Sequence, residues 1–117
     1  MNYFKDKEFA CRCCGRLLIC SELIEKLNAA RSQAGIPFII TSGYRCNKHN
    51  ENIAGVAESS HTRGKAVDIL FKNSQECFSI VKSLIYVGFK RIGINFNKRF
   101  IHCDIDESKP QNVLFDY

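Results

Sequence analysis

Two histidines and one aspartate in this chain are of the types that hold a metal ion. His61 and Asp68 stand in the stretch Ser-Ser-His-Thr-Arg-Gly-Lys-Ala-Val-Asp, and His102 stands in Phe-Ile-His-Cys-Asp. Zinc accepts imidazole nitrogen and carboxylate oxygen, and three protein ligands leave a fourth position open for water. An open position is what Lewis-acid chemistry requires. The three residues therefore predict a catalytic zinc site.

The local sequence also predicts how the first two ligands come together. Gly64 permits a tight turn that brings His61 back over the strand that follows. Asp68 then projects from that strand on the side that it shares with Ala66 and Leu70. The small side chain of Ala66 leaves room beside the metal.

The third ligand lies on a second strand, where alternation decides which residues face the metal. His102 and Asp104 are two residues apart and point to one face, whereas Ile101 and Cys103 point to the other. Asp104 therefore lies near any metal that His102 binds. Taken singly, a histidine in a loop or at a strand end is more often a structural residue.

Apolar periodicity and stop signals predict the elements that position these residues. A helix over residues 21–35 begins on a serine cap and stops at a glycine, and a second helix over residues 74–88 begins on another serine. Short β-rich runs predict strands over residues 38–41, 65–71, 91–94 and 100–105. Residues 46–64 are polar and without a period, which predicts a long functional loop. No element is assigned after residue 107.

This mixture predicts an α+β fold with a largely antiparallel sheet flanked by helices. The length of 117 residues suits one domain, so we expect residues 1–117 to form a single domain. No stretch approaches the ~20 apolar residues that span a bilayer, and we expect no membrane insertion. Residues 1–8 lack the apolar run of a secretory signal, so we expect synthesis in the cytoplasm.

Charge gives little further guidance. The net charge of +5 favours an anionic partner, such as nucleic acid or an acidic wall polymer. The basic residues form no concentrated stripe, so we do not expect nucleic-acid binding.

Seven cysteines are many for this length, but their odd number argues against a complete disulfide framework. Four of them cluster near the start of the chain: Cys11, Cys13, Cys14 and Cys20. Their spacing does not match a standard four-ligand motif, so we expect buried thiols or one disulfide and no second, structural zinc. A cysteine nucleophile paired with His49 or His102 is an alternative that the spacing does not demand, and His49 is expected to pack in its loop.

Three segments together resemble the family of zinc D-Ala-D-Ala carboxypeptidases and their peptidoglycan endopeptidase relatives, which share a fold with hedgehog signalling domains. They are Ser-Gly-Tyr-Arg at residues 42–45, the stretch of residues 59–69, and Ile-His-Cys-Asp at residues 101–104. The cysteine-rich opening over residues 9–15 is similar to the short, single-domain branch found in phages and prophages.

The resemblance implies a role for each site residue. The metal is zinc, and its ligands are His61, Asp68 and His102. Arg45 pairs with substrate or steadies a developing oxyanion, and Ser59 is a substrate-binding hydroxyl. These roles suit a site in which water attacks an amide.

The general base is the point at which this chain departs from the family. Many relatives carry an acid three residues before the last histidine, but Arg99 stands there and cannot accept a proton. We therefore expect Asp104 to be the base, with Asp106 as the next choice. The alternative for Asp104 is a carboxylate that orients a histidine ligand.

The activity that the resemblance implies is zinc-dependent hydrolysis of an amide bond in peptidoglycan stem peptides, by a carboxypeptidase or an endolysin-type endopeptidase. We expect a monomer that is released by phage lysis or carried in the virion. The main alternative is a hedgehog-like module that keeps zinc and binds wall fragments without cutting them. A weaker alternative is a protein that uses its positive charge to bind nucleic acid or wall polymer. Binding that weakens steeply with salt concentration would favour this alternative.

Overall fold

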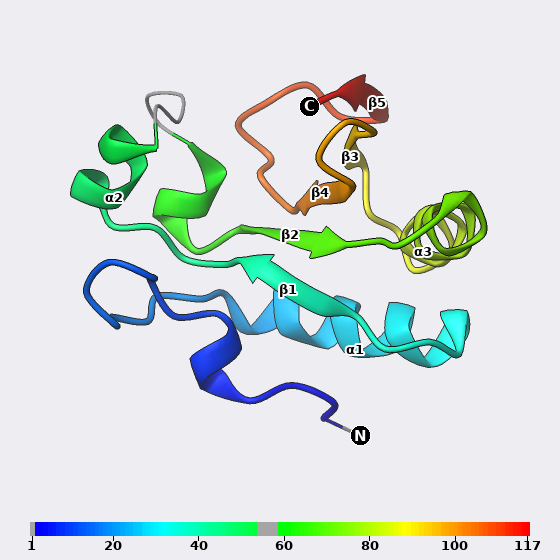
Figure 1. Ribbon diagram of the computed structural model, residues 1–117, viewed down its shortest axis with the longest axis horizontal. Coiled ribbons are helices and arrows are strands. Elements are labelled where there is room, and N and C mark those ends of the chain that lie inside the picture. The colour runs from blue at the N-terminus through cyan, green and yellow to red at the C-terminus, as the bar shows by residue number, and fades with distance from the viewer. Residues whose placement is uncertain (1, 54–58) are drawn as a thin grey trace.

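Helices and strands are interspersed along the chain, and its last three described elements are all strands (Figure 1). The computed structural model describes residues 2–53 and 59–117. Within them the order is η1 (Asp6–Glu8), α1 (Ser21–Ala34), β1 (Ile39–Ser42), α2 (Asn47–Asn52), η2 (Ser60–Arg63), β2 (Ala66–Leu70), α3 (Ser74–Tyr86), β3 (Arg91–Asn95), β4 (Phe100–Asp104) and β5 (Val113–Asp116).

The strands form one sheet in the order β1-β2-β4-β3-β5. The pairings β1–β2, β2–β4 and β3–β4 are antiparallel, and only β3–β5 is parallel among the described strands. Helices α1 and α3 pack against each other and against the sheet. The predicted α+β fold with a largely antiparallel sheet is therefore confirmed.

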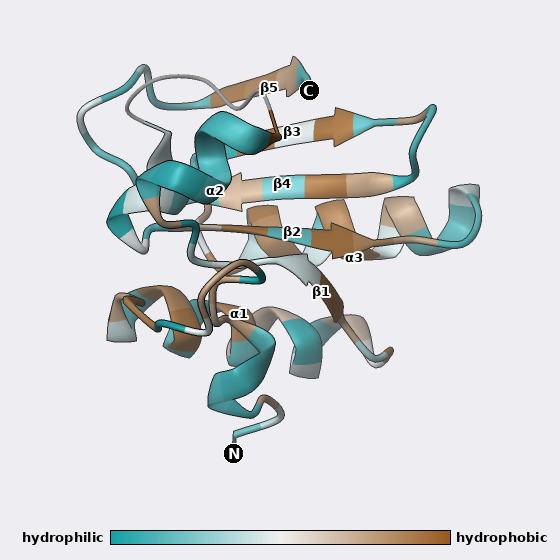
Figure 2. Cartoon of the chain, turned by 60° about the vertical axis from the view of Figure 1, so that its left-hand side comes forward, coloured by the Kyte–Doolittle hydropathy of each residue, from teal (hydrophilic) through white to brown (hydrophobic). Residues whose placement is uncertain are grey.

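Alternation along the central strands separates the core from the chemistry. Val67 and Ile69 of β2 and Ile101 and Cys103 of β4 join the apolar cluster with α1 and α3. Burying each aliphatic side chain there contributes about 1.5–3 kcal/mol to stability. Figure 2 shows the hydrophobic colour concentrated on these strands, whereas α2 on the other side is hydrophilic. The residues between them in sequence, including Asp68, point to that other face.

The helix ends differ by one residue from the expected caps. The N-cap of α1 is Cys20, which makes no side-chain cap bond, and Ser21 is the first helical residue. The N-cap of α3 is Asn73, whose Oδ1 accepts the N–H of Glu76 at 2.9 Å. Both predicted serine caps are therefore wrong. The glycine stop is confirmed, since Gly35 ends α1 with a left-handed φ of 71°.

Two further differences concern the segments that carried no predicted element. Part of the predicted loop over residues 46–64 folds as α2 and η2, while residues 54–58 lie outside the described residues. Strand β5 was not predicted, and it pairs with β3 at the edge of the sheet. None of the described helices is long and apolar enough to cross a membrane.

Candidate metal centre

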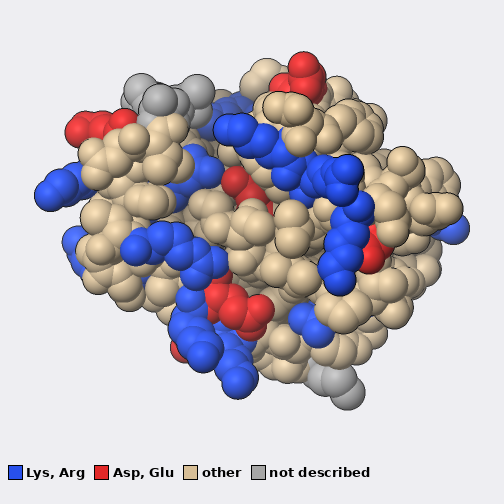
Figure 3. Space-filling model, viewed as in Figure 1, with Lys and Arg blue, Asp and Glu red and all other residues tan. Residues whose placement is uncertain are grey.

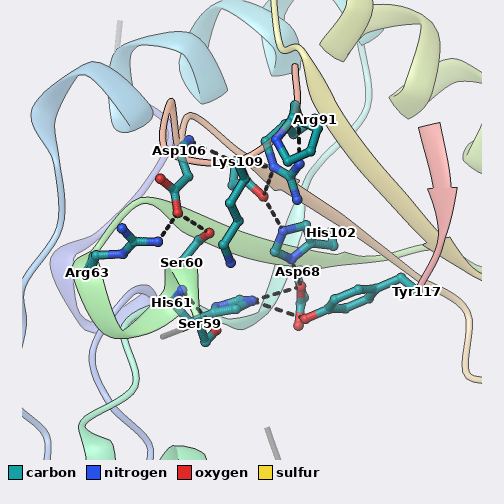
Figure 4. A network of polar contacts seen from close by, with 12 residues as sticks. Ser59, Ser60, His61, Arg63, Asp68, Arg91, His102, Asp106, Lys109 and Tyr117 are labelled. Atoms are coloured by element: carbon teal, nitrogen blue, oxygen red, sulfur yellow. Dashed lines mark hydrogen bonds and ion pairs between the residues drawn. The ribbon is translucent and has the colours of Figure 1, made fainter. Parts of the chain in front are cut away.

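The three predicted ligands converge on one point of the sheet face that α1 and α3 leave free. Asp68 of β2 pairs with His102 of β4, and His61 reaches them from η2. One ligand atom from each lies within 4.8 Å of the others. All three side chains are buried, with relative exposures of 0%, 3% and 6% for His61, Asp68 and His102. Figure 4 shows both rings turned to Asp68.

The turn after His61 depends on Gly64, as the sequence predicted. Gly64 has a φ of 69°, and a Cβ there would lie 2.3 Å from the carbonyl oxygen of Leu18. A side chain is excluded by both the backbone and the neighbour. At the start of η2, the hydroxyl of Ser59 accepts the N–H of His61 at 3.2 Å. The ligand is thus held by a cap on one side and a glycine on the other.

Hydrogen bonding sets the tautomer of His61. Its Nδ1 lies 2.8 Å from the carbonyl oxygen of Gly43, and because a carbonyl only accepts, Nδ1 carries the hydrogen. Nε2 is then an unprotonated acceptor, 3.2 Å from Oδ1 of Asp68. A cation between these two facing acceptors would remove their mutual repulsion. The arrangement therefore suits a shared metal ion.

His102 is oriented by a carboxylate. Its Nε2 lies 2.6 Å from Oδ2 of Asp104, which leaves Nδ1 directed at Oδ1 of Asp68, 3.2 Å away. Asp104 is itself held by Arg91, whose Nε lies 2.9 Å from Oδ1, and by the backbone N–H of Asp106. A carboxylate behind a ligating histidine is common in metal sites. Two imidazole nitrogens and one carboxylate oxygen can thus hold a metal ion here.

The electrostatics of the ligands follow from their burial and from one another. Burial lowers the pKa of His61 below its ordinary value. Burial alone would raise the pKa of Asp68, but hydrogen bonds with His102 and His61 hold it well below its usual range. Burial alone would lower the pKa of His102, and hydrogen bonds to Asp104 and Asp68 raise it instead. A metal that binds here displaces a proton, so its affinity depends on pH.

Arg45 is buried beside the ligands rather than exposed. Its Nη2 lies 3.2 Å from Oδ2 of Asp68, the carboxylate oxygen that does not face the histidines. Its Nε donates to Ser42 Oγ at 3.1 Å and its Nη1 to Asn50 Oδ1 at 3.3 Å. These contacts fix the guanidinium plane and place a positive charge at the edge of the centre.

The structure places the other residues of the predicted site as follows. Asp106 is fully buried and accepts hydrogen bonds from Ser60 at 2.7 Å and from Ser108 at 2.6 Å, and it pairs with Arg63. Arg99 lies in the turn before β4, where its guanidinium donates to a backbone carbonyl and points to Lys72 instead of the metal position.

Comparison with known proteins identifies the family. Residues 2–104 match the sequence profile of Peptidase M15. The chain belongs to the Peptidase M15 family. A comparison with curated proteins finds no match. Peptidase M15 proteins are zinc-dependent peptidases, so family and geometry agree on a metal-binding hydrolase.

Tyr117 is a residue of this Peptidase M15 site that sequence reasoning missed. The ring of Tyr117 stacks on His102 with centroids 4.4 Å apart, and its hydroxyl lies 3.4 Å from Nε2 of His61. Burial raises the pKa of Tyr117 to about 12, so the phenol keeps its proton at neutral pH. No motif surrounds this tyrosine, and only the parallel pairing of β5 brings it to the metal centre.

Gly93 is what allows Tyr117 to reach so far across the sheet. It lies in β3 opposite His102, and a Cβ there would be 2.5 Å from the ring of Phe115 and 2.8 Å from Cβ of Tyr117. The missing side chain lets both aromatic residues of the β5 segment lie over the histidine. Gly93 is therefore needed because the side chains of Phe115 and Tyr117 approach it closely, and not because of its backbone angles.

The cysteines divide between core and surface. Cys103 faces the apolar cluster, as alternation predicted, and Cys77 lies in the same cluster. All seven thiols are free, so of the two expected alternatives, buried thiols or one disulfide, the disulfide is not found. Cys13 and Cys14 are exposed, and the expectation of buried thiols is wrong for these two.

Proposed function

We propose that the chain is a zinc metallopeptidase that hydrolyses an amide bond in peptidoglycan stem peptides, as a D-Ala-D-Ala carboxypeptidase or an endolysin-type endopeptidase. The observation that carries the proposal is the convergence of His61, Asp68 and His102 in a chain of the Peptidase M15 family. Zinc in such a site supplies Lewis-acid activation of a carbonyl and lowers the pKa of a bound water.

Arg45 would serve both the metal and the substrate. By holding Oδ2 of Asp68, its guanidinium keeps Oδ1 turned toward the histidines. Its charge also lies where an amide oxygen becomes negative during attack, and a fixed donor there stabilises the transition state. The hydroxyl of Tyr117 offers a second donor at the same place. Ser59 stays our candidate for a substrate-binding hydroxyl, since its Oγ accepts the His61 N–H and can still donate.

Asp104 remains the predicted proton acceptor, but its contacts support the alternative role more strongly. Its two oxygens already accept hydrogen bonds from His102, Arg91 and the N–H of Asp106. Hydrogen bonding with His102 also keeps its pKa below the ordinary value, although burial alone would raise it. A carboxylate with these partners fits the orientation of His102 better than the removal of a proton from water.

One face of the molecule carries a basic border that suits an anionic peptide. On the face drawn in Figure 3, lysine and arginine side chains border the middle of the molecule, with acidic side chains between them. Stem peptides carry free carboxylates, which such a border attracts. The charge distribution on this face thus supports an anionic peptide as the substrate class.

A binding module is the second candidate, and one observation favours it. Both candidate bases, Asp104 and Asp106, are occupied by other partners, and Arg99 replaces the usual acid. A protein of this kind would hold zinc and wall fragments without cutting them.

Metal content and hydrolysis, measured together, test the proposal. We expect His61→Ala and Asp68→Ala to lose the zinc of this site and all hydrolysis of synthetic stem peptides, because each removes one of three ligands. His49→Ala is the matched control, since His49 lies in α2 outside the ligand group, and it should keep both. Zinc content unchanged in both ligand variants would contradict the site. Intact zinc with wall binding and no hydrolysis in wild-type protein would favour the binding module.

A further inference from the structure

A second group of metal-ligating side chains lies outside the centre described above. The sulfur atoms of Cys11, Cys14 and Cys46 are within 4.8 Å of one another. Cys11 is buried, Cys14 is exposed and Cys46 is half-buried, so the group opens to solvent on one side. We expected no second zinc site from the sequence, because Cys46 is far from the other two cysteines along the chain.

The turn that carries the first two thiols has the spacing of a zinc-binding loop. Cys11 and Cys14 are separated by two residues, the commonest spacing of paired zinc ligands. The N–H of Gly15 donates to the carbonyl of Cys11 at 2.8 Å, and Gly15 has a φ of 73°, which a glycine adopts without strain. The N–H of Cys11 in turn donates to the carbonyl of Arg16 at 2.8 Å. The turn is closed at both ends and holds its two thiols on one side.

Backbone donors point at the sulfur atoms. The N–H of Cys46 lies 3.4 Å from Sγ of Cys11, and the N–H of His49 lies 3.4 Å from Sγ of Cys46. Burial alone would raise the pKa of Cys11, but hydrogen bonds from the backbone of Cys46, Cys14 and Cys13 lower it to about 7. Such donors stabilise a thiolate, which is the form that binds metal.

A fourth thiol, that of Cys13, lies next to Cys14 in the sequence. The thiol of Cys13 is within hydrogen-bonding reach of the thiol of Cys46, but it lies outside the 4.8 Å group and would have to turn toward the other three sulfur atoms to complete the set. Thiolates packed this closely repel one another, and a divalent cation removes the repulsion. We propose a second, structural zinc site whose ligands are Cys11, Cys13, Cys14 and Cys46. Soft sulfur ligands and a closed set of four favour zinc over magnesium or calcium.

The site would join the N-terminal segment to the wall of the catalytic centre. The N–H of Tyr44 donates to the carbonyl of Phe9 at 2.7 Å, and a Cβ on Gly43 would lie 2.6 Å from Phe9 Cα. Arg45 stands directly before the ligand Cys46. If the proposed function is correct, this zinc also positions Arg45, although the site itself does not depend on that function.

Elemental analysis of variants separates the two sites. Protein purified under reducing conditions should contain about two zinc ions per chain. Cys11→Ser and Cys46→Ser should each lose one ion and keep the ion bound by His61, whereas His61→Ala should lose only the other. Cys20→Ser is the control, because Cys20 lies outside the sulfur group, and it should keep both. Unchanged zinc in the two cysteine variants would overturn the proposal.

Cobalt spectra of the wild-type protein test the ligands even if a variant does not fold. Cobalt bound at the sulfur site should show thiolate-to-metal charge-transfer absorption, which the histidine and aspartate site cannot produce. The intensity should fall in Cys13→Ser, and unchanged intensity there would remove Cys13 from the set. An absence of this absorption, or a disulfide among these thiols in freshly purified protein, would overturn the site. Neither result would bear on His61.

Discussion

The two histidines of the centre are held by acceptors of different strength. His61 donates to the neutral carbonyl of Gly43, whereas His102 is bonded to the carboxylate of Asp104. A carboxylate partner makes an imidazole a stronger ligand than a carbonyl does. His102 should therefore contribute more to metal affinity, and Asp104 should matter to the metal even though it does not touch it.

Asp104→Asn tests this difference. The amide keeps the shape of the carboxylate but loses its charge, so we expect zinc affinity to fall about 10–100-fold. Competition with a chromophoric chelator measures the affinity, and hydrolysis of stem peptides is followed in parallel at saturating zinc. If the variant binds zinc as tightly as the wild type but has lost hydrolysis, Asp104 is the proton acceptor instead.

Tyr117→Phe isolates the hydroxyl that lies near His61. The ring would still stack on His102, so the fold and zinc content should not change. Loss of a donor to the developing oxyanion should reduce kcat by about 10²–10³ with little effect on KM. Tyr86→Phe is the control, because Tyr86 is exposed on α3. Equal kcat values for Tyr117→Phe and wild type would leave the tyrosine a packing role only.

The sequence allowed the three side chains that converge at the centre to be predicted, but not all of their surroundings. His61, Asp68 and His102 stand in motifs whose residue types and spacing imply the chemistry. Tyr117 and the partner of Asp104, Arg91, have no such signal. They reach the site only through the register of β3 with its neighbours.

At the scale of elements, the start of α3 offers a clean test of a cap. Asn73→Ala removes the side chain that accepts the N–H of Glu76, and we expect a loss of about 1 kcal/mol in the free energy of unfolding. Ser74→Ala is the matched control, because Ser74 is the first helical residue and not the cap. Urea denaturation measures both. A larger loss from Ser74→Ala would restore the serine as the cap.

Strong periodicity explains which elements could be predicted. Helices α1 and α3 bury one face each, and the core-facing residues of β2 and β4, which are buried on both faces, are apolar at every second position. Helix α2 is polar almost all round, with only Asn50 buried, so it has no apolar stripe to read. Strand β5 is a half-exposed edge strand of four residues, too short for its alternation to stand out.

At the scale of the whole molecule, Asp106 ties distant segments together. It accepts from Ser60 of η2, forty-six positions away in sequence, and pairs with Arg63 at the end of the same turn. It also bonds to Ser108 in the segment that leads to β5. One buried carboxylate thus joins the ligand-bearing turn to the C-terminal part of the chain.

Asp106→Asn tests the contribution of this buried carboxylate through the pH dependence of the free energy of unfolding. Burial raises the pKa of Asp106, but bonds from Ser108 and Ser60 outweigh it, so the folded pKa lies below the ordinary value. A lowered pKa adds stability above the ordinary aspartate pKa, and this stability is lost as pH falls through the folded pKa. We expect a cost of about 2 kcal/mol near neutral pH that shrinks in acid. A cost that does not change with pH would assign the effect to shape alone.

The aromatic cover that Gly93 permits has a consequence for the rate at which metal exchanges. Edge strands open locally at a lower free energy than the core, and β5 is both an edge strand and the support of the ring over His102. A chelator would then strip the centre no faster than this strand detaches from β3. The rate of metal loss should accordingly match the rate of amide hydrogen exchange in β5 and be much higher than the rate of global unfolding.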